Sequence, residues 1–252
     1  MDRIKAYQPE VYGFIFFLLL LNAWYLSGVA IDNRVIPKGY DIALSFLIPL
    51  MSGFFGAYSA FKLREKEERA KTYENEVAAI NTALFILGRQ LNVIGNIRNA
   101  ISLHKSDENR AIKLRANEII DYKAIRLNLD TLGFLIPKGQ TEILFALALE
   151  QELFELAIGV LETRSQFHID HFQPAFEKLD IQNSDIHSRE DFIAAIGEGL
   201  HSTLKVHTDN LYNTVEKSFI SLYSTQERLR PVAFELYPNA SFFSYELSEE
   251  YK

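Results

Sequence analysis

Two uninterrupted apolar runs dominate the start of the chain. Residues 11–31 read VYGFIFFLLLLNAWYLSGVAI and residues 42–61 read IALSFLIPLMSGFFGAYSAF, and neither run contains a formal charge. A helix of about 20 residues covers the ~30 Å hydrocarbon core of a bilayer. The linker 32–41 carries Pro37, Gly39 and four charges, so we predict two transmembrane helices joined in water. The alternative is a pair of buried helices in a soluble protein.

The few small and polar residues of these runs indicate how the helices pack. Gly53 precedes Ala57 by four residues, and Gly56 precedes Ala60 by four, so small side chains share one helix face. We favour packing within the hairpin on this face over packing between neighbouring chains. Asn22 either hydrogen-bonds across helices or lies near the outer interface.

The distribution of basic residues predicts the orientation. Arg3 and Lys5 precede the first run and five basic residues lie within 62–71, whereas the linker has only Arg34 and Lys38. The positive-inside rule places both termini in the cytoplasm. Residues 1–10 are then a cytoplasmic N-terminus and 32–41 an external, periplasmic linker.

A helical pattern continues directly after the second run, through residues 62–105. This stretch has no proline, and its start alternates in charge as a juxtamembrane helix near lipid headgroups does. We expect its apolar seam to pack inside a helical domain, with a coiled coil between subunits as the alternative. The seam consists of Val77, Ile80, Leu84, Leu87, Leu91 and Ile94.

Residues 141–172 form a second helical pattern, apolar nearly all round in its first half, which we expect at the centre of the core. Pro174 is expected to kink or stop it. The acidic residues Glu150, Glu152 and Glu155 are expected on a solvated face. The predicted inner stripe is Leu149, Leu153, Leu156 and Val160.

A third pattern covers residues 188–230, begins with a capping sequence at Ser188 to Asp191, and is expected to end at Pro231. Its stripe contains Ile193, Ile196, Leu200, Leu204, His207 and Leu211. Residues 111–139 favour short helices, and 231–252 form an aromatic, acidic tail. The fold class is all-α: a transmembrane hairpin, then a cytoplasmic helical domain over 106–230, built as an antiparallel bundle.

Composition and charge exclude several kinds of chemistry. The chain contains no cysteine, so disulfides, thiolate nucleophiles and cysteine-ligated zinc are absent. The net charge is −7, which argues against a broad nucleic-acid footprint. Phosphate-binding glycine loops and nucleophile-elbow motifs are also missing. We therefore predict no catalytic residue and no cofactor.

His168 and His171 are the weak candidates for a metal site. A spacing of three puts both on one face of an α-helix, where they could share a metal if His187 or His201 supplied a third ligand. The competing interpretation is a polar helix end. A metal-dependent hydrolase using this pair would contain stoichiometric metal.

The order of these elements resembles the two-transmembrane effectors of bacterial anti-phage systems, especially those attached to retrons. The resemblance rests on the spans 11–31 and 42–61, on the helix from Lys62, and on LGRQLNVIGNIRNAI, residues 87–101. It implies an inner-membrane, homo-oligomeric effector that a cytoplasmic partner holds inactive. In retrons that partner is a reverse transcriptase with its RNA–DNA hybrid, and release of the effector damages the membrane. The rival interpretation is a membrane-anchored scaffold or sensor whose bundle binds a cytoplasmic protein.

Overall fold

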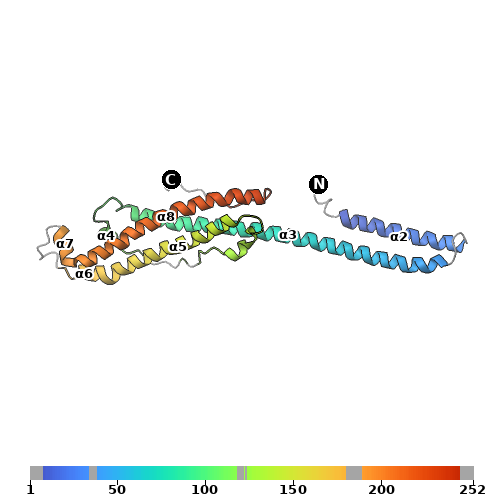
Figure 1. Ribbon diagram of the computed structural model, residues 1–252, viewed down its shortest axis with the longest axis horizontal. Coiled ribbons are helices and arrows are strands. Elements are labelled where there is room, and N and C mark those ends of the chain that lie inside the picture. The colour runs from blue at the N-terminus through green and yellow to red at the C-terminus, as the bar shows by residue number, and fades with distance from the viewer. Residues whose placement is uncertain (1–7, 34–38, 118–121, 123, 180–188, 245–252) are drawn as a thin grey trace. The chain divides into compact units, whose positions relative to one another are not determined.

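The chain folds almost entirely into helices (Figure 1). The computed structural model describes residues 8–33, 39–117, 122, 124–179 and 189–244, and none of these residues forms a strand. The predicted all-α class is therefore confirmed for this part of the chain. The chain divides into two compact units, Met1–Glu74 and Asn75–Lys252.

The first unit is a helical hairpin made of α2 (Gln8–Asp32) and the beginning of α3 (Gly39–Ser102). The Phe16 and Phe55 rings meet with their centroids 4.6 Å apart. One groove is lined by residues near the start of α2 together with later residues of α3, so the two helices run antiparallel. α3 is a single helix that contains the second apolar run and also the amphipathic stretch after it.

The seam of α3 lies at the core of the second unit. Ile80, Leu87 and Ile94 have no exposed surface, Leu84 and Leu91 are almost equally buried, and Val77 packs against them partly buried. The contacts come from α5 (Thr141–Phe167) and α8 (Glu198–Leu236) of the same chain. The seam is thus used within the chain, as expected for packing inside a helical domain.

Contacts between the long helices fix their directions. Between α5 and α8, Arg228 donates to Glu142 and the Phe167 ring contacts His207. Between α3 and α8, Tyr212 donates to the Ile101 carbonyl, and Tyr237, directly after α8, donates to Glu76. In both pairs the numbering runs in opposite directions, so α8 is antiparallel to α3 and to α5, beside which it lies (Figure 1). α3 and α5 are therefore parallel, and the prediction of an antiparallel bundle is wrong for this pair.

The parallel pair requires a long return connection, which residues 103–140 supply. Only α4 (Arg110–Lys113) and the 3₁₀ helix η1 (Leu129–Leu135) are regular within its described part. Lys138, near its end, pairs with Glu76 at 2.8 Å, back at the beginning of the α3 seam. The turn into α5 uses Gly139 at φ 76°, a left-handed conformation that glycine adopts without strain.

The predicted inner stripe of α5 is wrong for Leu149 and Leu156, whereas Leu153 is partly buried and Val160 packs partly buried against the core. Leu149 is 41% exposed and Leu156 54% exposed, whereas the opposite face is buried in the core. The buried face contains Ile143, Leu147, Glu150, Gln151, Phe154, Ala157 and Leu161. Because leucines occur on both faces of this helix, hydrophobicity could not distinguish them.

Pro174 does not stop the second helical pattern. α5 passes into the π-helical turn η2 (His168–Phe172) and then α6 (Gln173–Glu177), whose first turn contains Pro174. The first N–H groups of a helix need no intrahelical acceptor, so proline is tolerated there. Because α6 begins directly after the π-helical turn, Pro174 lies in the first turn of a new helix.

The third helical pattern is interrupted near its start, where no break was expected. It also continues past Pro231, where we expected it to end. α7 (Arg189–Ile196) is separated from α8 by Gly197 at φ 96°. α8 then continues through Pro231 to Leu236, which makes the predicted end at Pro231 wrong. Burial of Leu229 and Ala233 on either side of Pro231 explains why the helix survives one missing N–H. The predicted cap residue Ser188 lies outside the described residues.

Candidate functional site

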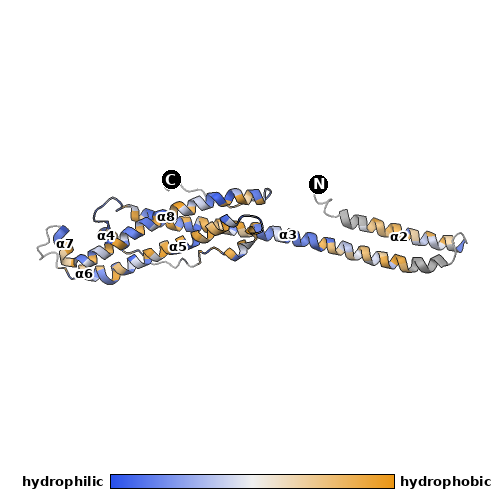
Figure 2. Cartoon of the chain, viewed as in Figure 1, coloured by the Kyte–Doolittle hydropathy of each residue, from blue (hydrophilic) through white to orange (hydrophobic). Residues whose placement is uncertain are grey.

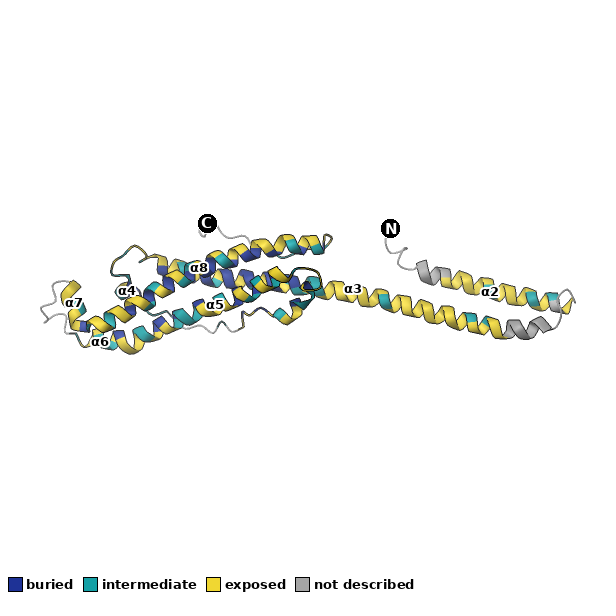
Figure 3. Cartoon of the chain, in the orientation of Figure 1, coloured by how far each residue is buried: buried dark blue, intermediate teal, exposed yellow. Residues whose placement is uncertain are grey.

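The described surface of the hairpin is apolar. Many aromatic and aliphatic side chains of α2 and of the first part of α3 are exposed, with Phe46 at 75% and Tyr25 at 68% (Figures 2 and 3). Water would strongly disfavour a continuous surface of this kind. Residues Gly13–Ala30 have a mean hydropathy of 1.8 and none of them is buried. α2 and α3 are both long and apolar enough to cross a membrane.

α3 contains two apolar stretches with opposite environments. Residues 46–61 are almost all exposed, whereas the stretch from Val77 onward is partly buried in the bundle core. Burial in the core already accounts for the apolar side chains of the second stretch. The first stretch has no such explanation within the chain.

Polar side chains of α2 bond to their own helix. The Asn22 side-chain amide donates to the Leu18 carbonyl at 3.1 Å, and the Ser27 hydroxyl donates to the Trp24 carbonyl at 2.7 Å. Asn22 therefore makes its observed bond within α2 and not across the hairpin. Such local bonds lower the penalty for placing polar groups in an apolar medium.

The small residues of α3 are not in close helix contact. Gly53, Gly56, Ala57 and Ala60 are all exposed, and a methyl group added at either glycine would meet no atom within 4 Å. Gly56 and Ala60 line the groove between the helices, but Gly53 and Ala57 are not among its lining residues. The small face thus divides into a groove side and an outer side.

Ion pairs follow the apolar stretch of α3. Lys62 pairs with Glu65 at 2.8 Å, Arg64 with Glu68 at 2.8 Å, and Arg69 with Glu65 at 2.5 Å. Hydrogen bonding from Lys62 and the nearby Arg69 charge lower the pKa of Glu65. Exposed pairs of this kind contribute little stability, so other anions can compete for the cations.

A buried amide pair joins three segments of the bundle. Gln151 accepts hydrogen bonds from the Gln90 side chain at 2.9 Å and from the Leu127 backbone at 2.8 Å. Gln90 also donates to the Ile125 carbonyl at 3.2 Å. These bonds fix the return connection against α3 and α5.

Glu150 is not on a solvated face, contrary to the sequence-based expectation. It is 3% exposed, and one carboxylate oxygen accepts bonds from Ser221 at 2.5 Å and Thr225 at 2.9 Å on α8. Its second oxygen has no partner within the described residues. Glu150 therefore joins α5 to α8 through hydroxyl groups and not through a cation.

Arg164 is the most unusual buried side chain. It is 1% exposed and donates to the backbone carbonyls of Ala111, Leu114 and Arg115, with the Arg115 contact at 2.6 Å. These carbonyls lie in and after α4, where a helix end leaves acceptors unpaired. Burial lowers the pKa of Arg164 to about 10, which leaves the guanidinium charged at neutral pH. No sequence motif marks this role.

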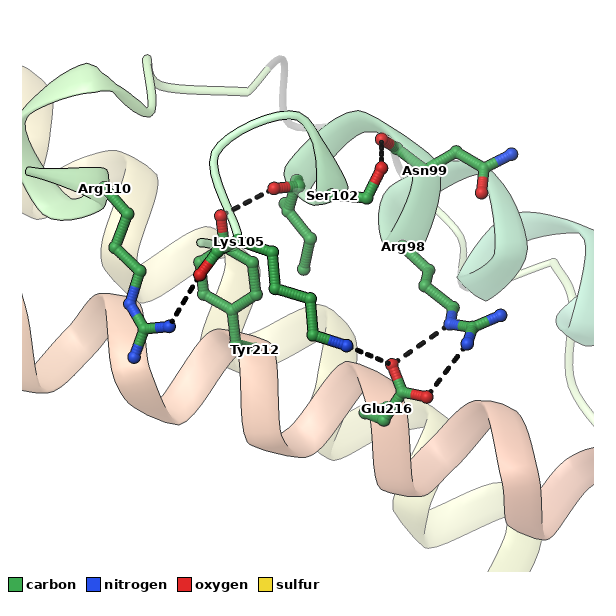
Figure 4. A network of polar contacts seen from close by, with 8 residues as sticks. Arg98, Asn99, Ser102, Lys105, Arg110, Tyr212 and Glu216 are labelled. Atoms are coloured by element: carbon green, nitrogen blue, oxygen red, sulfur yellow. Dashed lines mark hydrogen bonds and ion pairs between the residues drawn. The ribbon is translucent and has the colours of Figure 1, made fainter. Parts of the chain in front are cut away.

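One ion pair fastens the end of α3 to α8 (Figure 4), and a second fastens the start of α4 to α8. Arg98 donates to both carboxylate oxygens of Glu216, at 2.9 and 3.1 Å, and this bonding holds the pKa of Glu216 below its ordinary value. Arg110 donates to Asp209 at 2.7 Å, and the Tyr212 hydroxyl donates to the Ile101 carbonyl at 2.6 Å. Arg98, which interrupts the seam pattern, thus contributes an interhelical contact.

The histidine pair does not form a metal site in the described chain. The His168 ring contacts Phe172 and the His171 ring contacts Phe167, each in a tilted arrangement with ring centroids 5.0 Å apart. Both histidines lie in the π-helical turn, whose wider i→i+5 spacing removes the shared face that an α-helix would give. Burial and the positive charge of Arg164 lower the pKa of His168.

No cluster of three potential metal ligands exists among the described residues. His201 belongs to α8, and the other suggested ligand, His187, lies outside the described residues. His207 is partly buried, with its ring 5.1 Å from that of Phe167.

Comparison of the chain with protein-family models, with curated proteins and with solved structures found no match. Two features of the molecule itself indicate its function. One is the apolar hairpin, and the other is an apolar stripe of α5 in which Phe145, Leu149 and Leu156 are exposed and Leu153 and Val160 are partly buried.

Proposed function

We propose that the protein is a bacterial inner-membrane effector of the anti-phage type, anchored by the α2–α3 hairpin. The exposed apolar surface of the hairpin carries this proposal, because a bilayer is the solvent in which such a surface is stable. Seven basic residues flank the hairpin on the terminal side and two lie in its linker. This asymmetry favours a cytoplasmic bundle and two cytoplasmic termini.

The effector acts by assembling several hairpins. One hairpin without charges cannot conduct ions, but a ring of hairpins can open or disorder the bilayer. Gly53 and Ala57 are suited to contacts between chains, because they lie outside the hairpin's groove and are exposed. Small residues four apart allow helices to approach closely in lipid.

A cytoplasmic partner holds the effector inactive by covering the exposed stripe of α5. Phe145 is 63% exposed on this helix, and a surface of this kind is typical of a protein-binding site. The resemblance to retron effectors suggests the protein subunit of a reverse transcriptase–nucleic acid complex as the partner. α3 is continuous from Gly39 to Ser102, so a rearrangement of the bundle can reach the hairpin through one helix.

The proposal is tested by expressing the full-length chain without a partner in bacteria and measuring growth and membrane potential with a voltage-sensitive dye. We expect depolarisation, which Gly53→Leu abolishes because leucine blocks close approach between chains. Gly28→Leu is the matched control, since Gly28 also has open space and lies on α2. Unchanged membrane potential on expression of the wild-type chain would refute the effector function.

The stripe on α5 also fits a second function, a membrane-anchored scaffold that binds a cytoplasmic protein without damaging the bilayer. The two functions make different predictions for Leu156→Glu in cells that contain the partner. For the effector, disrupting the stripe releases inhibition and increases toxicity. For the scaffold, it abolishes partner binding and leaves membrane potential unchanged. Ile220→Glu on α8 is the control, because Ile220 is similarly exposed at 60%.

A further inference from the structure

The two helices of the hairpin enclose an open groove of about 860 Å³. Its α3 side follows one face of the helix, with small residues in the apolar stretch and lysines beyond it. A methyl group added at Gly56 or Gly13 would meet no atom within 4 Å, so the groove is open on both sides. The residues that line the groove include Gly13, Phe16, Ser52, Gly56, Lys62 and Lys66.

The length of the groove matches one leaflet of a bilayer. Ser52 and Lys62 are ten residues apart on α3, which corresponds to about 15 Å along a helix. Half of a ~30 Å hydrocarbon core has the same depth. A second, smaller hollow of about 380 Å³ shares Ser52 and continues along the hairpin towards Trp24 and Pro49.

The charges at the groove's end indicate what it binds. Lys62 and Lys66 are separated by one helical turn and lie where the apolar lining stops. Lys62 is held only by Glu65 in an exposed pair, with 52% of the lysine side chain accessible. Glu65 is shared with Arg69, so this turn of the helix has a net positive charge.

We propose that this groove binds one anionic phospholipid of the cytoplasmic leaflet. Its acyl chain lies between α2 and α3 beside Gly56, and its phosphate lies at Lys62 and Lys66. The proposal rests on the membrane location proposed above. A second copy of the hairpin is a poorer occupant, because its residues 62–71 carry five basic and three acidic side chains and would bring like charge to the lysines.

The lipid and the chain–chain contact use different sides of α3. Gly56 and Ala60 line the groove, whereas Gly53 and Ala57 do not. Lipid binding can therefore fail while hairpin assembly and membrane depolarisation remain intact, and the reverse also holds. A bound lipid would fill the space between the helices that the chain leaves open.

The test uses full-length protein in a mild, uncharged detergent and native mass spectrometry with phosphatidylglycerol or phosphatidylcholine of identical acyl chains. We expect a preference of about 30-fold for phosphatidylglycerol, since two interfacial lysines contribute about 2 kcal/mol and 1.4 kcal/mol is tenfold. The double variant Lys62→Gln, Lys66→Gln should lose this preference. Gly56→Leu should lose both lipids, because leucine fills the groove.

Each variant has a matched control on the same helix. Arg64→Gln with Lys71→Gln removes the same charge and breaks the pair of Arg64 with Glu68, but neither residue lines the groove. Gly53→Leu adds the same side chain outside the groove. Both controls should keep the wild-type preference, and circular dichroism should show that all variants remain helical.

Three outcomes would overturn the proposal. Equal retention of the two lipids by the wild-type protein would remove the role of the lysines. Equal effects of the groove variants and their controls would remove the groove itself. If Gly56→Leu changed the number of chains per particle and left lipid binding intact, the groove would be an interface between copies.

Discussion

Arg164 offers a quantitative test of the bundle, because its three acceptors are all backbone carbonyls in or just after α4. We predict that Arg164→Met unfolds the contact between α5 and the return connection. A buried carbonyl left without a donor costs about 1–3 kcal/mol. Removing the arginine also removes the cost of burying an ion, which is several kcal/mol, and this offsets part of the destabilisation.

The net destabilisation expected for Arg164→Met is roughly 2–4 kcal/mol. The second unit contains residues 75–252, and in domains of that size 1 kcal/mol lowers Tm by about 2–4 °C. The Tm of the bundle should therefore fall by roughly 6–12 °C for the middle of this range. Thermal unfolding of full-length protein in detergent, followed by circular dichroism at a helical wavelength, measures this change.

Two further variants show whether the geometry of Arg164 is responsible. Arg164→Lys keeps the charge but not the planar fork that reaches several carbonyls, so it should also be strongly destabilising. Arg126→Met removes an arginine whose side chain is 68% exposed and paired with Glu155, and it should change stability by less than about 1 kcal/mol. If Arg164→Met unfolded at the same temperature as Arg126→Met, the account of the buried carbonyl contacts would be wrong.

Two other stability predictions follow from the bundle. The pKa of Glu216 lies below its ordinary value of 4.5 because Arg98 hydrogen-bonds to it, so the unfolded chain binds more protons than the folded chain below that pH. The stabilisation is present above pH 4.5 and is lost on acidification through the folded pKa. Glu216→Gln should therefore lower Tm at pH 7 by a few degrees and reduce the further fall of Tm on acidification below pH 4.5; an unchanged pH profile would contradict this. Gly197→Ala places a side chain at φ 96° and should destabilise the junction of α7 and α8 by about 1–2 kcal/mol in urea titrations. Gly199→Ala, in the regular part of α8, should be neutral or stabilising by about 0.4–1 kcal/mol, and equal effects of the two would argue against the strained conformation.

The seam of α3 could be predicted from the sequence because its apolar residues recur at intervals of three and four. The face from Ile80 to Ile94 that this spacing selects is buried. The same argument failed for α5, whose leucines lie on both faces. There the buried face also contains Glu150, Gln151 and Arg164, which a hydrophobicity pattern assigns to the surface.

The partners of these polar residues explain why local sequence could not place them. Glu150 bonds to residues of α8 more than 70 positions away, and Arg164 bonds to carbonyls about 50 positions before it. Backbone carbonyls leave no trace in the sequence, because every residue has one. The parallel arrangement of α3 and α5 could not be predicted from the sequence either. The length of the connection 103–140 is compatible with a chain that returns along the bundle.

The histidine pair illustrates a different limit. The spacing of His168 and His171 indicates a shared face only if the helix is an ordinary α-helix, and here the turn is π-helical. The glycines of the second run were expected to share one packing face, and in the structure Gly56 lines the groove while Gly53 does not. The side of α3 that faces α2 depends on how far apart the two helices lie, and the spacing of residues in the sequence does not encode that distance.

Cysteine labelling tests the central claim that the hairpin crosses a membrane and leaves the bundle inside the cell. The natural chain has no cysteine, so single substitutions report one site each. Asn33→Cys, at the end of α2, and Glu152→Cys, on the exposed side of α5, are placed at opposite sides of the proposed topology. With a membrane-impermeant maleimide applied to spheroplasts, we expect labelling of Asn33→Cys in intact spheroplasts and of Glu152→Cys only after lysis. Labelling of both sites only after lysis, with the protein in the soluble fraction, would contradict it.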